Sequence, residues 1–489
     1  MIRHTRIKAI QAAICSLLMS TTCAAWWAAP TQAPQEVYRD LMPMGQNFPG
    51  SPPADAERIS RTLHFSQHPG KFQLLRLCYP PQHRRSTGLY RAPDDAPLTI
   101  NLHSATGKHS AILRVGAHRN TPNQHRPEKA TSWTYLEKGV QVFTPKTSGL
   151  IYIESGVGLS GTFDITISGA VKAPWFKTGR DNLAQWQNDI RYYPAPWAEL
   201  EGRHAILTLP SAMIRDLDDP TGVIAFYDKV VEDVNALMGL SEQAEDARDR
   251  APDLPFRFVL DPALTGTGIN AVSGYPISLN WMAYKDPFVW LTPEHPQTRA
   301  VLLHELGHNY ESMLYRAEPP GARQAFADLM NYGYQYREGY WFLGDLSSRH
   351  GLYKDDFHCA YFPSLFYFFS FVYGALPRRS TYAPGVWGDD KDFFQEEKQA
   401  FMIHLVRRLS HEFIADFYRE FRHTPENALP GRNDPQARTD YFFETLCKVT
   451  RKDLTGFFKN WYVPVSQNAY QRVADKGYNR PAWAGHDGL

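Results

Sequence analysis

The sequence predicts an N-terminal antiparallel β-sandwich followed by an α+β catalytic domain with a helical C-terminal part. Two observations support this fold class. Short apolar runs separated by Gly, Pro, Asn and Asp fill residues 55–172, a pattern typical of sandwiches. After residue 173, a few strand-like runs give way to segments with the apolar spacing of helices. The chain has 489 residues, enough for roughly two to four domains and a sizeable core.

The N-terminus is expected to be a signal peptide, because basic residues precede a mostly apolar stretch at 9–25 that ends in small residues. Its apolar core is too short for a membrane span. Cleavage after Ala25 and cleavage after Ala33 both fit. We assign residues 1–33 to the signal peptide and the start of a linker, and expect export to the periplasm or the medium. Lipidation of Cys23 is not expected, because the preceding residues lack the usual Leu and small Gly or Ala.

Composition argues against nucleic acid as a partner but does not settle whether the cysteines form a disulfide. The 52 basic and 51 acidic side chains give a net charge of +1, and no long basic run occurs, so nucleic acid is not an expected partner. We expect a monomer. Loss of the signal peptide leaves three cysteines, too few for a disulfide framework. A Cys359–Cys447 bridge is one possibility, and three separate buried thiols, including Cys78, are the other.

The expected sandwich at 55–172 consists of short strands between turn residues. None of its segments carries an ionisable cluster that indicates chemistry, so a binding or packing module is the default interpretation. The strands are expected at 72–77, 98–102, 111–115, 141–143, 150–153 and 162–167.

Pro- and Trp-rich turns at 172–198 mark the start of the expected catalytic domain, 173–489. Strands are expected at 205–209 and 256–260. Between them, apolar residues from Val223 to Leu237 recur at helical spacing, and Pro220 marks a plausible start of that helix.

The segment HELGH, with His304, Glu305 and His308, is the strongest functional signal in the chain. One helical turn separates the two histidines, so both imidazoles lie on one face and can bind the same Zn²⁺. Glu305 follows the first ligand, where its carboxylate can take a proton from the attacking water. The apolar run at 300–303 is typical of a helix buried beneath a site. The motif therefore predicts a hydrolase with one zinc ion per chain.

A catalytic zinc needs a third protein ligand and an open position. Asp328 is the preferred candidate, because it lies in the next predicted helix, 323–336, which can return a carboxylate over the two histidines. Glu311 is too close to His308 to reach back. Glu318 lies in a turn where a solvated side chain is more common, but it remains an alternative, as does a site without a third protein ligand.

At these residues the chain resembles the enhancin-like zinc metallopeptidases, a gluzincin-type family that includes bacterial enzymes cleaving mucins and glycoproteins. The resemblance covers nearly the whole mature chain and rests on the shared order of several short strings. These are GLY at 88–90, VGAH at 115–118, GLIYI at 149–153, ISGA at 167–170, APWAELEG at 195–202, SGYPI at 273–277 and HELGHN at 304–309.

The resemblance implies proteolysis of glycoproteins or peptides, with recognition of O-linked glycans beside the scissile bond. Where the family carries Glu-Val-x-Asn-Asn in the second helix, this chain has DLMNY at 328–332, so Asp328 takes the place of the family's glutamate. Tyr275, Tyr310 and Asn331 are candidate substrate contacts, and residues 275–277 are a candidate edge strand that pairs with an extended peptide.

Two other functions remain open. One is a secreted glycan- or protein-binding module with a degenerate zinc site. The presence of Asp328 where the family has glutamate favours this function, whereas the intact HELGH segment argues against it. The other is a zinc hydrolase that acts on a non-peptide bond, such as a cell-wall amide.

Overall fold

The computed structural model describes most of the chain, with gaps. The described residues are 38–67, 84–94, 96–105, 111–120, 129–155, 161–264, 270–282, 286–292, 296–310, 317–338 and 395–485. The expected signal peptide, the strand at 72–77, Cys78, Cys359 and Glu311 lie outside them. The chain divides into two compact units, Met1–Met42 and Pro43–Leu489. Within the described part, no helix is long and apolar enough to cross a membrane.

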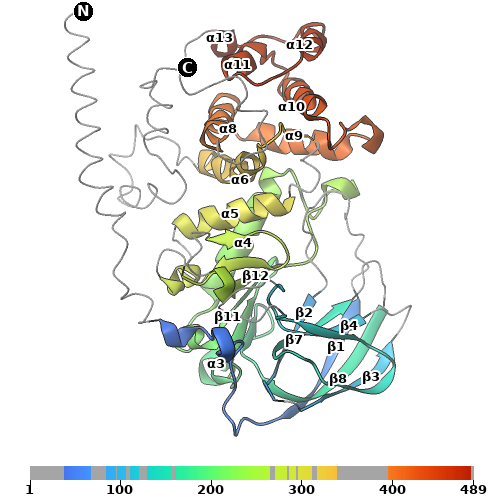
Figure 1. Cartoon of the computed structure of the whole chain (residues 1–489), viewed down its shortest axis with the longest axis vertical. Coiled ribbons are helices and arrows are strands. Elements are labelled where there is room, and N and C mark those ends of the chain that lie inside the picture. The colour runs from blue at the N-terminus through green and yellow to red at the C-terminus, as the bar shows by residue number, and fades with distance from the viewer. Residues whose placement is uncertain are drawn as a thin grey trace, which may run out of the picture. The chain divides into compact units, whose positions relative to one another are not determined.

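The N-terminal part is one antiparallel sheet of eight strands that nearly closes on itself (Figure 1). Its strands follow the order β5-β4-β7-β2-β8-β3-β6, with β1 also paired to β8. The strands are β1 Ile59–Gln67, β2 Arg84–Arg91, β3 Leu98–Ala105, β4 Ala111–Val115, β5 Ser132–Tyr135, β6 Gly139–Phe143, β7 Gly149–Ser155 and β8 Gly161–Lys172. The predicted strands from 98 onward are therefore present, but they form one continuous sheet rather than two separate ones.

The long strand β8 connects the two halves of this sheet. It pairs with β3 as far as Ser168 and with β1 as far as Ala170, where a register shift skips Gly169, and its last residues, Val171 and Lys172, pair with β2. Gly169 lies at this register shift, just after the last residue paired with β3, and its φ of +93° is a conformation that residues with a side chain rarely adopt. A bend at this glycine lets one strand serve both halves. The enclosed core consists mainly of alternate residues from six strands, among them Leu98, Ile100, Leu113, Ile153 and Ile165.

A six-stranded mixed sheet follows, in the order β13-β14-β12-β11-β10-β9. β11, β12 and β14 run parallel, whereas β10 and β13 are antiparallel to their neighbours β11 and β14. The strands are β9 Trp175–Lys177, β10 Trp197–Glu201, β11 Ala205–Pro210, β12 Phe256–Asp261, β13 Ala271–Val272 and β14 Ile277–Asn280. Every residue of β10, β11 and β12 is buried, so both faces of this sheet are covered.

Helices α4 and α5 lie beside this sheet, and α6 packs on α5 (Figure 1). As predicted, α4 follows Pro220, and Asp219 accepts the backbone N–H of Thr221 at 2.8 Å. The helices are α3 Leu183–Asn188, α4 Thr221–Leu237, α5 Pro296–Tyr310, α6 Arg323–Arg337, α8 Gln395–Leu409, α9 Glu412–His423, α10 Pro435–Thr450, α11 Thr455–Asn460, α12 Gln467–Ala474 and α13 Ala482–Gly485. The α+β prediction with a helical C-terminal part is confirmed.

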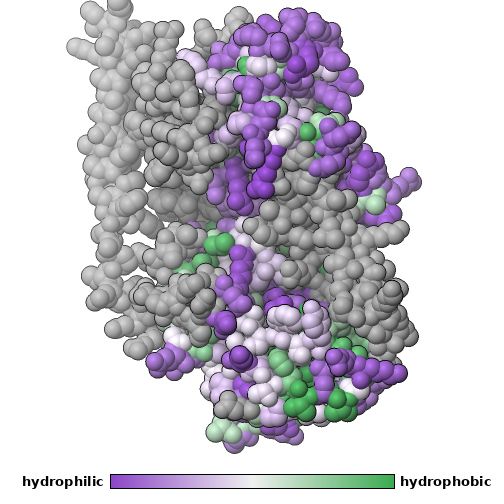
Figure 2. Space-filling model, turned by 45° about the vertical axis from the view of Figure 1, so that its right-hand side comes forward, coloured by the Kyte–Doolittle hydropathy of each residue, from purple (hydrophilic) through white to green (hydrophobic). Residues whose placement is uncertain are grey.

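Figure 2 shows apolar side chains gathered at the lower end of the view, whereas polar residues dominate the C-terminal helices. Strands β5 and β6, which follow each other in the chain and lie at the two ends of the strand order, carry four exposed large apolar residues. They are Trp133, Tyr135, Val140 and Val142, with exposures from 48% to 70%.

Candidate active site

The HELGH segment lies in α5, which is helical because its apolar residues line a buried face. Val301, Leu302, Leu303 and Leu306 are 1% exposed or less. Gly307 on the same helix faces the backbone of α6, where a Cβ atom would come within 2.5 Å of the Ala327 carbonyl oxygen. The missing side chain thus allows α5 and α6 to approach closely.

This approach brings the two predicted histidine ligands together. His304 Nε2 and His308 Nε2 are 3.1 Å apart, with the rings at 87° to each other. Two nitrogens bound to one tetrahedral Zn²⁺ lie about 3.3 Å apart. The two Nε2 atoms therefore fit a shared metal ion.

Asp328 of α6 lies on the other nitrogen of His304. Its Oδ1 is 2.6 Å from His304 Nδ1, and the carboxylate is 1% exposed. An ionised carboxylate only accepts hydrogen bonds, so Nδ1–H donates to Asp328 and the lone pair of the neutral ring is on Nε2. Asp328, the predicted third ligand, thus contacts the side of His304 that faces away from His308.

The third side chain at the two Nε2 atoms is Gln324, which the motif did not indicate. Gln324 Oε1 is 3.2 Å from His308 Nε2 and lies one turn before Asp328 on α6. Among the described residues, no three His, Cys, Asp or Glu side chains are grouped to hold a metal ion. The converging set is instead two imidazoles and one amide oxygen.

The environment favours the protonation states that a hydrolytic zinc site needs. Burial, and then the neighbouring His304, lower the pKa of His308 to about 4. His308 is therefore neutral near pH 7, the form that binds metals. Burial also raises the pKa of the Glu305 carboxyl above its usual value, although the two histidines and the Ser273 backbone N–H offset part of the rise. A raised pKa suits a general base near neutral pH.

The loop before β14 packs against the far end of the motif. Asn309 accepts the Gly274 backbone N–H at 2.7 Å and donates to the Gly274 carbonyl at 3.0 Å, while Ser273 contacts Glu305 through its N–H. Because β14 lies between β12 and β13, the prediction of an edge strand at 275–277 is wrong. The edge is β13, Ala271–Val272.

The N-terminal sheet contributes a charged residue to this loop. Arg119, in the turn after β4, donates to the carbonyls of Ser273 and Pro276, the latter at 2.7 and 2.9 Å. Its positive charge also acts on Glu305. No ionisable cluster in the N-terminal sequence indicated this contact, because the partners are carbonyl groups more than a hundred residues away.

The remaining predicted residues are all largely buried. The Tyr275 hydroxyl is buried, and the Arg84 guanidinium lies 5.2 Å from its ring. Tyr310 is 2% exposed and donates its hydroxyl hydrogen to Asn235 on α4. Asn331 is buried one turn after Asp328. Glu318 is buried rather than solvated, with Oε1 3.8 Å from Arg438 Nη2.

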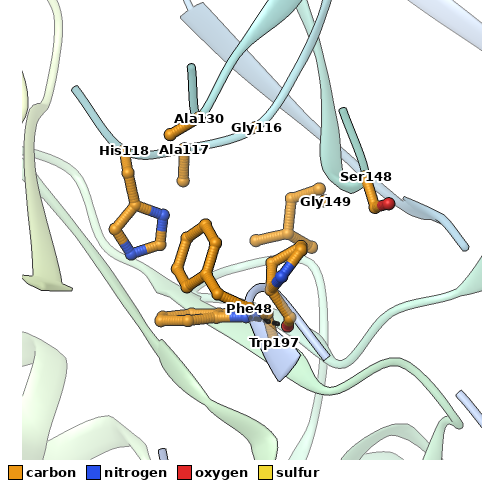
Figure 3. Close-up of a pocket in the computed structure, with 10 residues that line it drawn as sticks. Phe48, Gly116, Ala117, His118, Ala130, Ser148, Gly149 and Trp197 are labelled. Atoms are coloured by element: carbon orange, nitrogen blue, oxygen red, sulfur yellow. Dashed lines mark hydrogen bonds between the residues drawn. The ribbon is translucent and has the colours of Figure 1, made fainter. Parts of the chain in front are cut away.

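A small pocket lies where the N-terminal sheet meets β10 (Figure 3). The His118 ring stands between the apolar side chains of Phe48 and Trp197, with ring centroids 4.9 and 4.6 Å away. The volume of this pocket, about 10 Å³, is too small for a sugar or a peptide side chain. We regard this pocket as a small gap in the packing between the N-terminal sheet and β10.

Comparisons with known proteins agree with the geometry. Residues 169–319 match the sequence profile of peptidase M60, enhancin and enhancin-like. A TRPM8 channel-associated factor homolog from Danio rerio is 27% identical over 345 residues, which are 69% of this chain and 33% of that protein. The chain therefore spans about a third of the length of this curated relative.

Two solved structures share the fold. The catalytic module of the metalloprotease ZmpA from Clostridium perfringens superposes with a TM-score of 0.62 at 16% identity, over 86% of this chain and 79% of that module. IMPa from Pseudomonas aeruginosa, solved in complex with an O-glycopeptide, gives a TM-score of 0.61 at 16% identity, over 90% of this chain and 53% of that one. The region that carries the HELGH helix, residues 169–319, therefore belongs to the enhancin-like peptidase M60 family.

Proposed function

We propose that the protein is a zinc-dependent endopeptidase that cleaves polypeptide bonds in glycoproteins outside the cytoplasm. One observation carries the proposal: two histidine Nε2 atoms 3.1 Å apart, with the buried carboxylate of Glu305 on the same helix. His304 and His308 would hold the zinc, with the ring of His304 oriented by the contact of Asp328 with Nδ1.

Bound Zn²⁺ would act as a Lewis acid toward the scissile carbonyl. Glu305 accepts a proton from the attacking water and delivers it to the leaving amine. Its burial keeps bulk water away from the carboxylate, and the Ser273 N–H holds one of its oxygens in place. The Arg119–Pro276 contact keeps the loop that carries Ser273 at the site.

The proposed substrate class rests on fold likeness and on the expected signal peptide. IMPa, which shares the fold, is solved in complex with an O-glycopeptide. An exported enzyme meets glycoproteins at the cell surface or in the medium. We extend these two points to a polypeptide substrate with O-linked glycans near the cleaved bond.

Digestion of mucin-type glycopeptides and matched unglycosylated peptides, followed by mass spectrometry of the products, tests the proposal. We expect internal peptide-bond cleavage that needs zinc and is stronger with the glycan present. Glu305→Gln should keep the fold and the metal but lose nearly all hydrolysis, by at least about 100-fold, because only the proton acceptor is removed. Substantial turnover by Glu305→Gln would remove Glu305 from the role of general base.

A second candidate function is a secreted binding module with a weakened zinc site. The neutral amide of Gln324 beside the histidine pair favours it. The curated relative is named for association with a channel rather than for peptidase activity. This candidate predicts that the protein binds glycopeptides without cleaving them, in the presence or absence of zinc.

A further inference from the structure

We propose that Gln324, rather than Asp328, completes the zinc-binding face with His304 and His308, and that Asp328 acts only as a positioning residue. This inference rests on the proposed zinc site. It assigns the chain a ligand set of two imidazoles and one amide, which has no negative charge.

The assignment follows from which ring nitrogen each side chain of α6 contacts. Asp328 Oδ1 is 2.6 Å from His304 Nδ1, whereas the histidine pair meets through the two Nε2 atoms. The lone pairs of Nδ1 and Nε2 point in widely different directions in the plane of the ring. A carboxylate hydrogen-bonded to Nδ1 is therefore on the wrong side of His304 to share a metal with Nε2.

Gln324, unlike Asp328, contacts the histidine pair on the Nε2 side, where a shared metal ion would bind. Its Oε1 lies 3.2 Å from His308 Nε2, which is itself 3.1 Å from His304 Nε2. Residues four apart on a helix share one face, so Gln324 and Asp328 both project from α6 toward α5. The close contact between Gly307 of α5 and Ala327 of α6 fixes the distance between the two helices near Gln324 and Asp328.

An amide oxygen changes the chemistry of the site. Zinc sites are built from imidazole, thiolate and carboxylate ligands, and neutral carbonyl oxygens are weaker donors to this ion. Two imidazoles and an amide leave the full double charge of the ion without a compensating ligand. We therefore infer that this site binds zinc reversibly and that its occupancy follows the zinc concentration around the protein.

Zinc titration of the metal-free full-length protein against a chromogenic chelator tests the assignment. Gln324→Glu adds the missing charge and should tighten zinc binding by about tenfold or more. Gln324→Ala should weaken it. Gln243→Glu is the matched control, because Gln243 is exposed and its Oε1 only accepts the Ser241 hydroxyl at 3.1 Å, which a carboxylate also does. This control should leave the affinity unchanged.

Asp328→Asn separates the two roles, since the Asn oxygen still accepts the His304 Nδ1–H. If Asp328 is a positioning residue, zinc binding should fall by no more than the roughly 10- to 100-fold typical of outer contacts. If Asp328→Asn abolished binding while both Gln324 variants matched the wild type, the third ligand would be Asp328 and our assignment would be wrong.

His304→Ala distinguishes failure of the assignment from failure of the proposed function. Zinc binding that His304→Ala leaves intact would refute the proposed site as a whole. If the wild type bound no zinc while Gln324→Glu did, the proposed peptidase would be refuted but the position of Gln324 would be supported.

Discussion

Asn309 shows how single residues hold the site together. Its amide donates to and accepts from the backbone of Gly274, which anchors the loop that also supplies the Ser273 N–H to Glu305. Gly274 has φ +130°, and a Cβ there would collide with the Arg119 guanidinium. The loop is thus held by side chains from two parts of the chain.

We predict that Asn309→Asp destabilises the fold by about 1–3 kcal/mol, because the new carboxylate still accepts from Gly274 N–H but repels the Gly274 carbonyl. Urea unfolding at pH 7 measures the loss. Asn188→Asp is the control, since Asn188 is exposed and donates only to a helix carbonyl. An Asn309→Asp variant as stable as the control would show that the paired contact contributes little.

At this scale the sequence predicts the histidine pair but not the third contact. His304 and His308 are one turn apart on a helix, so their common face follows from helix geometry alone. Gln324 and Asp328 are also one turn apart, and either could face the metal. Which one does depends on how far α6 is shifted along α5, and this shift is set by packing at Gly307.

The contact between α5 and α6 depends on that glycine. Gly307→Ala should destabilise the protein by about 1–3 kcal/mol through overpacking against Ala327, and zinc binding should weaken because Asp328 moves off His304. Thermal unfolding and the chelator titration measure the two effects. Gly222→Ala on α4 is the matched control, because nothing lies within 4 Å of its Cβ position, and it should be neutral or stabilising. Equal stability and zinc affinity of the two variants would contradict this role of Gly307.

Three strands of the N-terminal sheet are joined by one carboxylate. Glu154 on β7 accepts from Arg84 on β2 at 2.8 Å and from Arg114 on β4 at 2.6 Å. Burial alone would raise the pKa of Glu154, but the Arg114 hydrogen bond and the charge of Arg84 outweigh it, so the pKa lies below its usual value. Its stabilising effect is therefore complete above the unfolded pKa of about 4.3 and lost as the pH falls through the lower folded value.

Glu154→Gln should consequently lower the unfolding temperature at pH 7, and the deficit should shrink as the pH falls below about 4. Calorimetry between pH 7 and 3 follows the difference from the wild type. Glu137→Gln, at an exposed position on the turn between β5 and β6, should show no such trend. A deficit that stays constant over this range would mean that Glu154 is not ionised in the folded protein.

Element identity was more predictable than element pairing. Alternating apolar residues indicated the strands from 98 onward, but pairing needs contacts between distant segments. The bend at Gly169 that joins the two halves of the N-terminal sheet carries no periodic signal. The same limit explains residues 275–277, since only the short strand β13, paired with Ser278 and Leu279, makes β14 an interior strand.

Over the whole molecule, the N-terminal sheet and the mixed sheet share buried polar contacts. Arg257 on β12 pairs with Glu199 on β10, and both side chains are at most 1% exposed. Tyr152 of the N-terminal sheet donates to the same Glu199 at 3.0 Å, and Arg257 donates to Ser86 at 3.2 Å. Removal of one partner of a buried ion pair strongly destabilises a protein, because the other charge stays buried without compensation. The N-terminal sheet is therefore part of the structural support of the site.

Arg119→Ala tests this support at the site itself. We expect peptidase kcat/KM to fall by up to about 100-fold, mainly through kcat, because the loop that contacts Glu305 loses its anchor. Zinc affinity should be unchanged, since Arg119 touches neither histidine in the described contacts. Arg203→Ala, which removes an exposed ion pair with Glu242, is the control. Unchanged kinetics for Arg119→Ala would show that the N-terminal sheet has no part in positioning the site.

The central claim is that one zinc ion binds between His304 and His308. Anomalous diffraction at the zinc edge, from crystals of the zinc-loaded protein, tests it most directly. We predict one strong peak per chain within bonding distance of His304 Nε2 and His308 Nε2, about 2.0–2.1 Å from each nitrogen. No peak at the histidine pair, or a peak only at other residues, would contradict the claim.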